Sequence, residues 1–206
     1  MKTKKILALL LAAVMLCSFA AACSSDEGEE TGGVKDTVVV AINGEPTKLT
    51  PYLDTSANNT IVEIQMLEPL FRMDNEGNVH PLLAESYEYE DETTLVVKLR
   101  EGVKFHNGDT LTADDVVASL QWAQGFAEVN LYNKNFVSIS KVDDSTVEIK
   151  TDGPDAMVLL NLCHHGNAIV PKKLIDEGHD FNEDPVGSGP YKLVEWKRGD
   201  SLTFEA

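Results

Sequence analysis

The consecutive residues Cys163, His164 and His165 have side chains that bind metal ions or act in nucleophilic catalysis. Adjacent side chains point in different directions, and the sequence offers no CxxC or HxxxH pair to complete a metal site. A histidine that activates a cysteine normally comes from a distant part of the chain. We therefore interpret Cys163 as a small buried thiol and the histidines as part of a connection. We predict no metal site and no cofactor.

Two other patterns could be read as catalytic. The Gly-Ser-Gly-Pro segment at 187–190 lacks the Lys-Ser/Thr ending of a Walker loop and the third glycine of a dinucleotide loop. Its proline also removes a backbone donor, so we predict a tight structural turn. The adjacent aspartates at 114–115 and 143–144 fit helix capping and turns. The sequence thus contains no catalytic constellation, and we predict that the protein is not an enzyme.

The elements that would position these residues are visible as hydrophobic patterns. The β-branched run Thr37–Ile42 predicts a buried strand. Ile61, Ile64 and Leu67 have helical spacing, and Pro69 predicts that this helix ends just before it. Both elements would lie in the first third of the chain.

Further elements follow along the chain. The alternation of Leu95, Val97 and Leu99 predicts a strand with one more apolar face, and Thr112 with Asp115 predicts a capped helix start. Further short elements are predicted at 136–142, 146–151, 172–177, 191–196 and 202–204, with a helix or strand at 156–162. The alternation of strands and helices predicts a mixed α/β (α+β) fold.

Composition limits the class of protein. The chain has 206 residues, 43% of them hydrophobic, and a formal net charge of −17. These values are typical of a globular protein and exclude collagen, coiled coil and a fully disordered chain. Because phosphates would be repelled by so acidic a surface, we expect no nucleic-acid partner.

The N-terminus has the pattern of an export signal. Three lysines precede the apolar run Ile6–Cys17, which is short for a membrane span, and we predict a signal peptide over 1–22. The small residues before Cys23 fit ordinary signal peptidase and also resemble a bacterial lipobox. We expect lipidation at Cys23, followed by an acidic flexible tether over 23–35. The protein would then be exported, and either anchored to the outer face of the cytoplasmic membrane or periplasmic.

Five segments occur in a characteristic order. They are EPLF at 68–71, PLLAES at 81–86, LREGVKFHNGD at 99–109, VGSGPY at 186–191 and WKRGD at 196–200. Together they resemble the family 5 extracellular solute-binding proteins, the oligopeptide, dipeptide and nickel receptors of ABC importers. The resemblance covers about Val38 to Ala206. It departs at 49–51, where Leu-Thr-Pro stands in place of the family's frequent Leu-Asp-Pro.

The resemblance implies a fold like that of type II periplasmic binding proteins, in which two lobes close on a ligand and an extra domain is inserted. Segments 36–56 and 163–206 would form part of the first lobe, and 57–162 the inserted extra domain. The second lobe would be missing from this chain, so that the fold is incomplete.

The resemblance also implies a ligand site. In peptide-binding relatives the ligand main chain pairs with an extended stretch that corresponds here to Thr55, Ser56 and Ala57. Such pairing forms hydrogen bonds to the main chain of the ligand and therefore tolerates many ligand side chains. Tyr132, from the extra domain, is the candidate aromatic residue lining the pocket.

The implied function is ligand capture without bond breakage. A monomeric, lipid-tethered receptor would bind oligopeptides or dipeptides and deliver them to the permease and ATPase subunits of an ABC importer. Nickel chelates or oligosaccharides are alternative ligands for the same class of receptor. Hypotheses from other classes are an exported hydrolase using Cys163 and a structural lipoprotein without a ligand.

Overall fold

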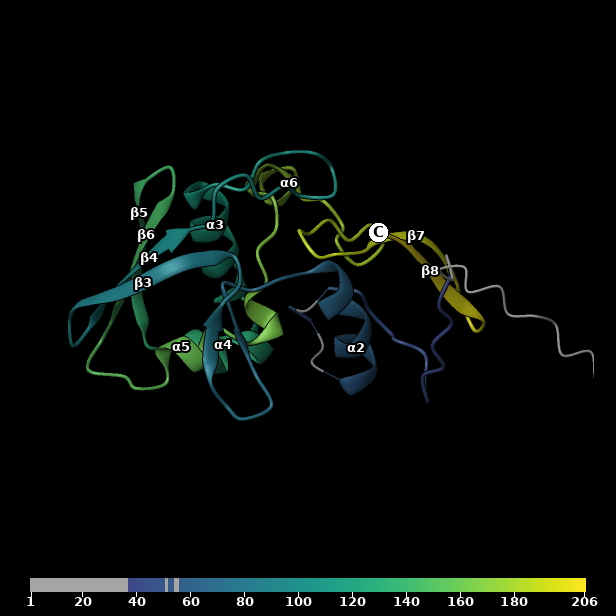
Figure 1. Cartoon of the computed structure of the whole chain (residues 1–206), viewed down its shortest axis with the longest axis horizontal. Helices are drawn as coiled ribbons and strands as arrows, with labels where there is room; N and C mark the ends of the chain where they lie inside the picture. The colour runs from purple at the N-terminus through teal and green to yellow at the C-terminus, as the bar shows by residue number, and fades with distance from the viewer. Residues whose placement is uncertain (1–36, 51, 54–55) are drawn as a thin grey trace, which may run out of the picture. The chain divides into compact units, whose positions relative to one another are not determined.

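The computed structural model describes residues 37–50, 52–53 and 56–206. The predicted signal peptide, Cys23, the tether and Thr55 lie outside these residues. The chain divides into two units, 1–41 and 42–206, and the elements below all belong to the second. This unit has the mixed α/β structure that the sequence predicts (Figure 1).

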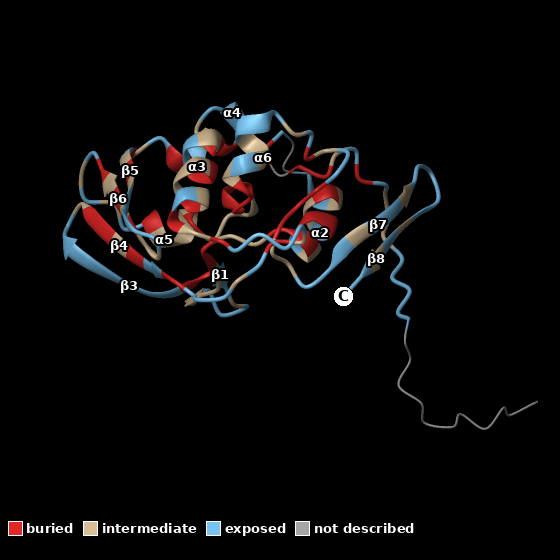
Figure 2. Cartoon of the chain, turned by 90° about the horizontal axis from the view of Figure 1, so that it is seen from above, coloured by how far each residue is buried: buried red, intermediate tan, exposed pale blue. Residues whose placement is uncertain are grey.

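A four-stranded antiparallel sheet forms the centre of the residue 84–151 region. Its strands run in the order β3-β4-β6-β5, and the central strand β4 pairs Val97 with Tyr87 on one side and Val147 on the other. The predicted alternation is confirmed, because Leu95, Val97 and Leu99 are buried while Lys98 is exposed. In Figure 2 most of β4 is accordingly red. The strand bounds are β3 Ala84–Asp91, β4 Thr94–Leu99, β5 Phe136–Asp143 and β6 Thr146–Thr151.

Helix α3 (Ala113–Ala123) packs on the β5 and β6 side of this sheet (Figure 1). It begins as predicted, since Asp115 accepts hydrogen bonds from the Thr112 amide at 2.9 Å and hydroxyl at 2.8 Å. The second carboxylate oxygen of Asp115 accepts from the Lys172 amide at 2.8 Å. One residue therefore caps α3 and fixes the chain that enters α6 (Lys172–Glu177).

Short elements complete the unit. Helix α5 shows that the segment at 156–162 contains a helix and not a strand. The elements predicted at 136–142 and 146–151 pair as an antiparallel hairpin, and so do those predicted at 191–196 and 202–204. The remaining bounds are β1 Phe71–Met73, β2 Val79–Pro81, α4 Ala127–Asn133, α5 Val158–Asn161, the 3-10 helix η1 His165–Asn167, β7 Lys192–Lys197 and β8 Ser201–Glu205.

Helix α2 (Ala57–Met66) ends before Pro69, as predicted, but buries a different face. Ile61 and Ile64 are 43% and 49% exposed, whereas Val62 and Met66 are buried. Of the three residues with helical spacing, Leu67 is buried, whereas Ile61 and Ile64 are largely exposed. Sequence spacing allowed more than one apolar face, and packing of Met66 into the core selected the other one.

The segment 37–42 is not a strand, which corrects the predicted buried strand. Val38, Val39 and Val40 are 74–91% exposed. A β-branched run becomes a strand only where a neighbouring strand supplies hydrogen-bond partners. Within the described residues no strand pairs with this segment.

The glycine-rich segment at 187–190 is a close-packed turn, as predicted. A Cβ on Gly187 would lie 2.2 Å from the Met66 carbonyl oxygen, and one on Gly189 would lie 2.6 Å from the Gln65 carbonyl oxygen. On its other side His106 binds the turn, with its amide donating to Gly187 O at 2.8 Å and its Nε2 lying 2.9 Å from Gly189 O. Three segments distant in the sequence thus meet at this turn.

Within residues 37–50, 52–53 and 56–206, no helix combines the length and the apolar character needed to cross a bilayer.

Candidate ligand-binding site

An unbroken series of contacts joins Ser56 to Tyr132. The Thr60 hydroxyl donates to the Ser56 carbonyl oxygen at 3.1 Å and lies 3.3 Å from Nε2 of His165. The rings of His165 and His164 have centroids 4.2 Å apart. The His164 ring stacks on Tyr132 at 3.9 Å with an interplanar angle of 23°. Two predicted site residues, Ser56 and Tyr132, are therefore linked through Thr60, His165 and His164, which were not predicted to belong to the site.

Ser56 and Ala57 stand at the start of α2 and are both exposed. Ser56 is the N-cap residue, with extended backbone (φ −65°, ψ 146°), while Ala57 is the first helical residue. Of the described residues in the predicted extended stretch, Ser56 has extended backbone, whereas Ala57 is helical and not extended. Ala57 instead contributes one of the amides that a helix leaves without an internal partner.

Tyr132 is the penultimate residue of α4 and is held by its neighbour Asn133. The side-chain amides of Asn133 and Asn167 bond each other in both directions, and both residues are fully buried. Asn167 also donates to the Asn161 carbonyl oxygen at 2.9 Å. Since Asn167 ends η1, this pair fixes α4 against the segment that contains His164 and His165.

Tyr52 anchors the chain just before the proposed edge. Its hydroxyl donates to the Ala168 carbonyl oxygen at 2.6 Å, and its ring packs on Trp122 and Phe126 with centroids 4.7 Å and 5.6 Å away. Complete burial raises the pKa of this phenol well above its ordinary value, so it remains a neutral donor. The anchor joins the residues before α2 to the residue that follows η1.

Burial determines the charge state of the two histidines. It lowers the pKa of His164 to about 4, with His165 as a smaller cause, and it lowers the pKa of His165 in the same direction. Both rings are therefore neutral at pH 7. The Gly166 amide donates to Nδ1 of His164 at 3.0 Å, and a Cβ on Gly166 would lie 2.7 Å from a methyl group of Val129. Only glycine allows this close approach.

Cys163 has the properties of a structural thiol. It is a free cysteine whose Sγ donates to the Leu159 carbonyl oxygen at 3.3 Å. Burial raises its pKa, whereas a nucleophilic cysteine requires a lowered pKa. This environment argues against the hydrolase hypothesis. Within the described residues, no three His, Cys, Asp or Glu side chains are placed to bind a metal ion together.

His164 and His165 could not be predicted as site residues from the sequence, because their partners are distant in the chain. Thr60 precedes His165 by 105 residues, and Tyr132 lies in another helix. The one local indication was Gly166, a small residue directly after the two histidines. That glycine is required at this position is evident only from the close packing of Val129 against it.

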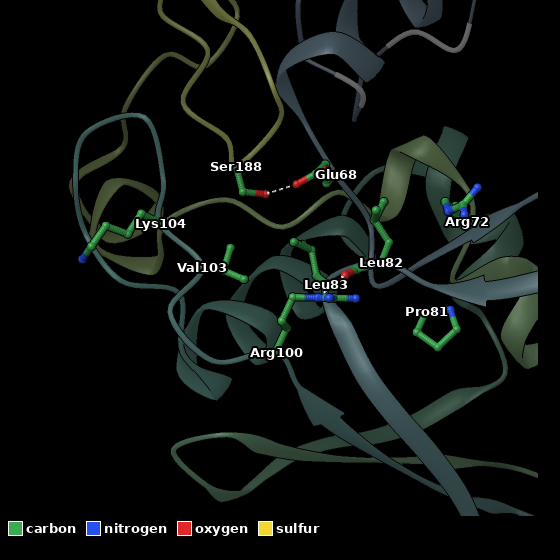
Figure 3. A pocket seen from close by; sticks show the side chains of 9 residues that line it. All are labelled: Glu68, Arg72, Pro81, Leu82, Leu83, Arg100, Val103, Lys104 and Ser188. Carbon is green, nitrogen blue, oxygen red and sulfur yellow. Dashed lines mark hydrogen bonds between the residues drawn. The ribbon is translucent and has the colours of Figure 1, made fainter. Parts of the chain in front are cut away.

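A separate hollow of about 550 Å³ lies beside the β1–β2 hairpin (Figure 3). In it Ser188 donates to Glu68 at 2.9 Å, and burial raises the pKa of Glu68. Arg72 and Lys104 lie at opposite ends of the hollow and extend away from each other, so they do not converge on one ligand group. None of the predicted ligand-binding residues lines it.

The fold is that of a solute-binding protein. The family model for bacterial extracellular solute-binding proteins, family 5 (middle region), matches residues 78–206, and the chain belongs to this family. Members of the family are binding proteins of transport systems and not enzymes. The family suggested by the five ordered segments is thereby confirmed.

Individual relatives agree with this assignment. The glutathione-binding protein GsiB of Escherichia coli O1:K1 / APEC is 37% identical over 172 residues, covering 79% of this chain and 33% of that protein. The oligopeptide-binding protein AppA of Bacillus subtilis, solved with a nonapeptide, is 32% identical with a TM-score of 0.69, over 79% of this chain and 34% of AppA. NikZ of Campylobacter jejuni, solved with Ni(L-His), is 28% identical with a TM-score of 0.73, over 84% of this chain and 36% of NikZ.

These similarities confirm the predicted fold class, a type II periplasmic-binding-protein fold. The chain spans about a third of the length of the relatives that it matches.

Proposed function

We propose that this chain is part of the substrate-binding receptor of an ABC importer, which captures oligopeptides or dipeptides and delivers them to a permease with its ATPase subunits. The contact series from Ser56 to Tyr132 is the observation that carries the proposal. It places an exposed helix start beside two neutral imidazoles and a tyrosine ring. Main-chain donors and acceptors with aromatic surface are suited to peptides of varied sequence.

The predicted domain division and membrane attachment are part of the same proposal. Segments 36–56 and 163–206 would belong to the first lobe, and 57–162 to the extra domain. Lipid on Cys23 and the tether over 23–35 would hold an exported monomer at the outer face of the membrane. Ligand capture would then proceed by closure of a second lobe over the site.

Receptors for nickel chelates are a second candidate. The fold similarity to NikZ and the presence of two neutral imidazoles support it. We favour peptides because the Gly166 amide donates to Nδ1 of His164, so that the neutral ring carries its proton on Nε2 and has no lone pair left for a metal ion. Of the two rings, only His165 then has a lone pair to offer a metal ion.

Ligand binding by the protein expressed from its complete reading frame tests the proposal. The probes are glutathione, a pool of tri- to pentapeptides, and Ni²⁺ with L-histidine, each followed by thermal shift and calorimetry. A peptide at 100 times its Kd should stabilise the protein by about 2.7 kcal/mol. Binding of none of the three probes would reject the receptor function.

Two tyrosine variants localise the binding. Tyr132→Ala should weaken peptide binding because it removes the ring that covers His164. Tyr89→Ala is the matched control, since Tyr89 is 45% exposed on strand β3 and makes no contact with the site. An equal loss of peptide affinity in both variants would show that the peptide does not bind at the site described above.

A further inference from the structure

We propose that His164 and His165 together form a donor–acceptor pair that bonds the N–H and C=O of one residue of an extended peptide ligand. In this arrangement Nε2–H of His164 donates to the ligand carbonyl, and Nδ1 of His165 accepts from the ligand amide. The inference rests on the proposed peptide-receptor function and assigns a specificity role to two particular side chains.

The protonation pattern of His164 follows from its backbone contact. The Gly166 amide can only donate, so Nδ1 of His164, 3.0 Å away, must be the unprotonated nitrogen. A neutral imidazole carries its single proton on the other nitrogen, which here is Nε2. Among the described residues Nε2 of His164 has no hydrogen-bond partner. His164 therefore offers one free donor.

The protonation pattern of His165 is determined by Thr60. The Thr60 hydroxyl has a single proton, which it donates to the Ser56 carbonyl oxygen at 3.1 Å. Its oxygen must then accept from Nε2–H of His165, 3.3 Å away. Nδ1 of His165 is left unprotonated, and no group in the described part of the chain donates to it. His165 therefore offers one free acceptor.

A donor and an acceptor on neighbouring rings match a particular feature of extended peptides. The N–H and C=O of one residue in a strand lie on the same side of the chain and bond together to one partner residue. The rings of His164 and His165 are direct neighbours, with centroids 4.2 Å apart and planes inclined at 33°. The two imidazoles can thus take the place of one residue of a neighbouring strand.

The surroundings hold the pair in one orientation. Tyr132 stacks on the ring of His164, and the Asn133–Asn167 amide pair fixes α4 against η1. Recognition by side chains with a fixed donor and acceptor requires little reorganisation on binding.

Substitution of each histidine by Asn or Gln tests which ring nitrogen binds the ligand. The polar atoms of Asn lie near the position of the replaced Nδ1, and those of Gln near the position of the replaced Nε2. We expect His164→Gln to keep the affinity for the bound peptide and His164→Asn to lose it about tenfold. For His165 the order reverses, with His165→Asn keeping the affinity and His165→Gln losing it about tenfold. A purely structural role for the histidines would not produce this reversal.

The measurement is calorimetry with the peptide from the probe pool that binds the wild-type protein most tightly. His80→Gln, on the β1–β2 hairpin, is the control for loss of a histidine elsewhere. Variants that all bind like the wild type would overturn the inference while leaving the receptor function intact. If only the nickel–histidine probe bound, and no peptide did, the inference would likewise be overturned while a receptor function remained. Binding of no probe would remove the receptor function itself, and the inference with it.

A second measurement does not depend on the folding of any variant. The 15N chemical shifts of the histidine side chains, measured by NMR on the wild-type protein, show which ring nitrogen carries the proton. We expect both His164 and His165 to be protonated on Nε2 in the free protein at pH 7. A proton on Nδ1 of either ring would overturn the assignment of donor and acceptor.

Discussion

The side-chain amide of Asn133 and that of Asn167 form a closed pair, in which each donates to the carbonyl oxygen of the other, across 34 residues of sequence. Both residues are completely buried. Because buried amides without partners are strongly unfavourable, this pair permits one relative position of α4 and η1. The stacking of Tyr132 on His164 follows from that position.

We expect Asn133→Ala to lower the free energy of unfolding by about 2–3 kcal/mol, because Asn167 would keep a buried polar group without its partner. Urea denaturation measures the change. Asn130→Ala, in the same helix but without a side-chain hydrogen bond in the described structure, should alter stability by less than about 0.5 kcal/mol. Equal effects of the two substitutions would contradict a special role for the pair.

The turn at 187–190 should not tolerate side chains at its glycines. Gly187→Ala would place a Cβ 2.2 Å from the Met66 carbonyl oxygen, so α2 and the turn would have to separate. We expect a loss of about 3 kcal/mol in thermal or urea unfolding. Gly153→Ala is the control, since nothing lies within 4 Å of its Cβ position, and its stability should stay equal or rise slightly. A stable Gly187→Ala protein would refute the close packing.

Cys163 should react slowly with alkylating reagents. Burial raises the pKa of its thiol, so the reactive thiolate is scarcer at pH 7.5 than in an exposed cysteine. The measurement uses a chain with Cys17→Ser and Cys23→Ser, so that Cys163 is the only thiol that the reagent can modify. Iodoacetamide should modify the folded protein more slowly than the same protein in urea. Faster reaction in the folded state would restore the hydrolase hypothesis.

The depressed pKa of His164 makes stability depend on pH. In the unfolded chain this imidazole titrates near its ordinary value of 6.5, and in the folded protein at about 4. Between these values the unfolded state binds more protons, so the free energy of unfolding falls as pH is lowered from about 6.5 towards 4. Histidine NMR should show the His164 midpoint near 4, and His164→Gln should lose less stability over this range. A midpoint near 6.5 would contradict the burial effect.

Patterns of short range were well predicted. The strand around Leu95, Val97 and Leu99 and the helix start at Thr112 and Asp115 depend on alternation and on a cap three residues away. Such features are contained within a few residues, and the structure agrees with them. The glycine-rich turn at 187–190 was also interpreted correctly as structural, although its packing partner Met66 was not foreseeable.

The strand predicted at 37–42 is wrong, and the exposure of part of the apolar pattern in α2 has the same cause. Val39 is 91% exposed and Ile64 is 49% exposed, although both lie in strongly apolar patterns. A hydrophobic pattern indicates that a segment is suited to burial, whereas actual burial depends on which other segment packs over it. That information is not local.

The fold class and the family follow from the sequence, because ordered motifs and hydrophobic periods are properties of the chain. The candidate residues Thr55, Ser56, Ala57 and Tyr132 come from the family resemblance and stay predictions. Only the tertiary structure decided that Ser56 and Tyr132 belong to one contact series, and that His164 and His165 connect them. The reason is physical. The proton positions and charges of these imidazoles are set by Gly166, Thr60 and burial, and contacts across 105 residues arise only when the chain is folded.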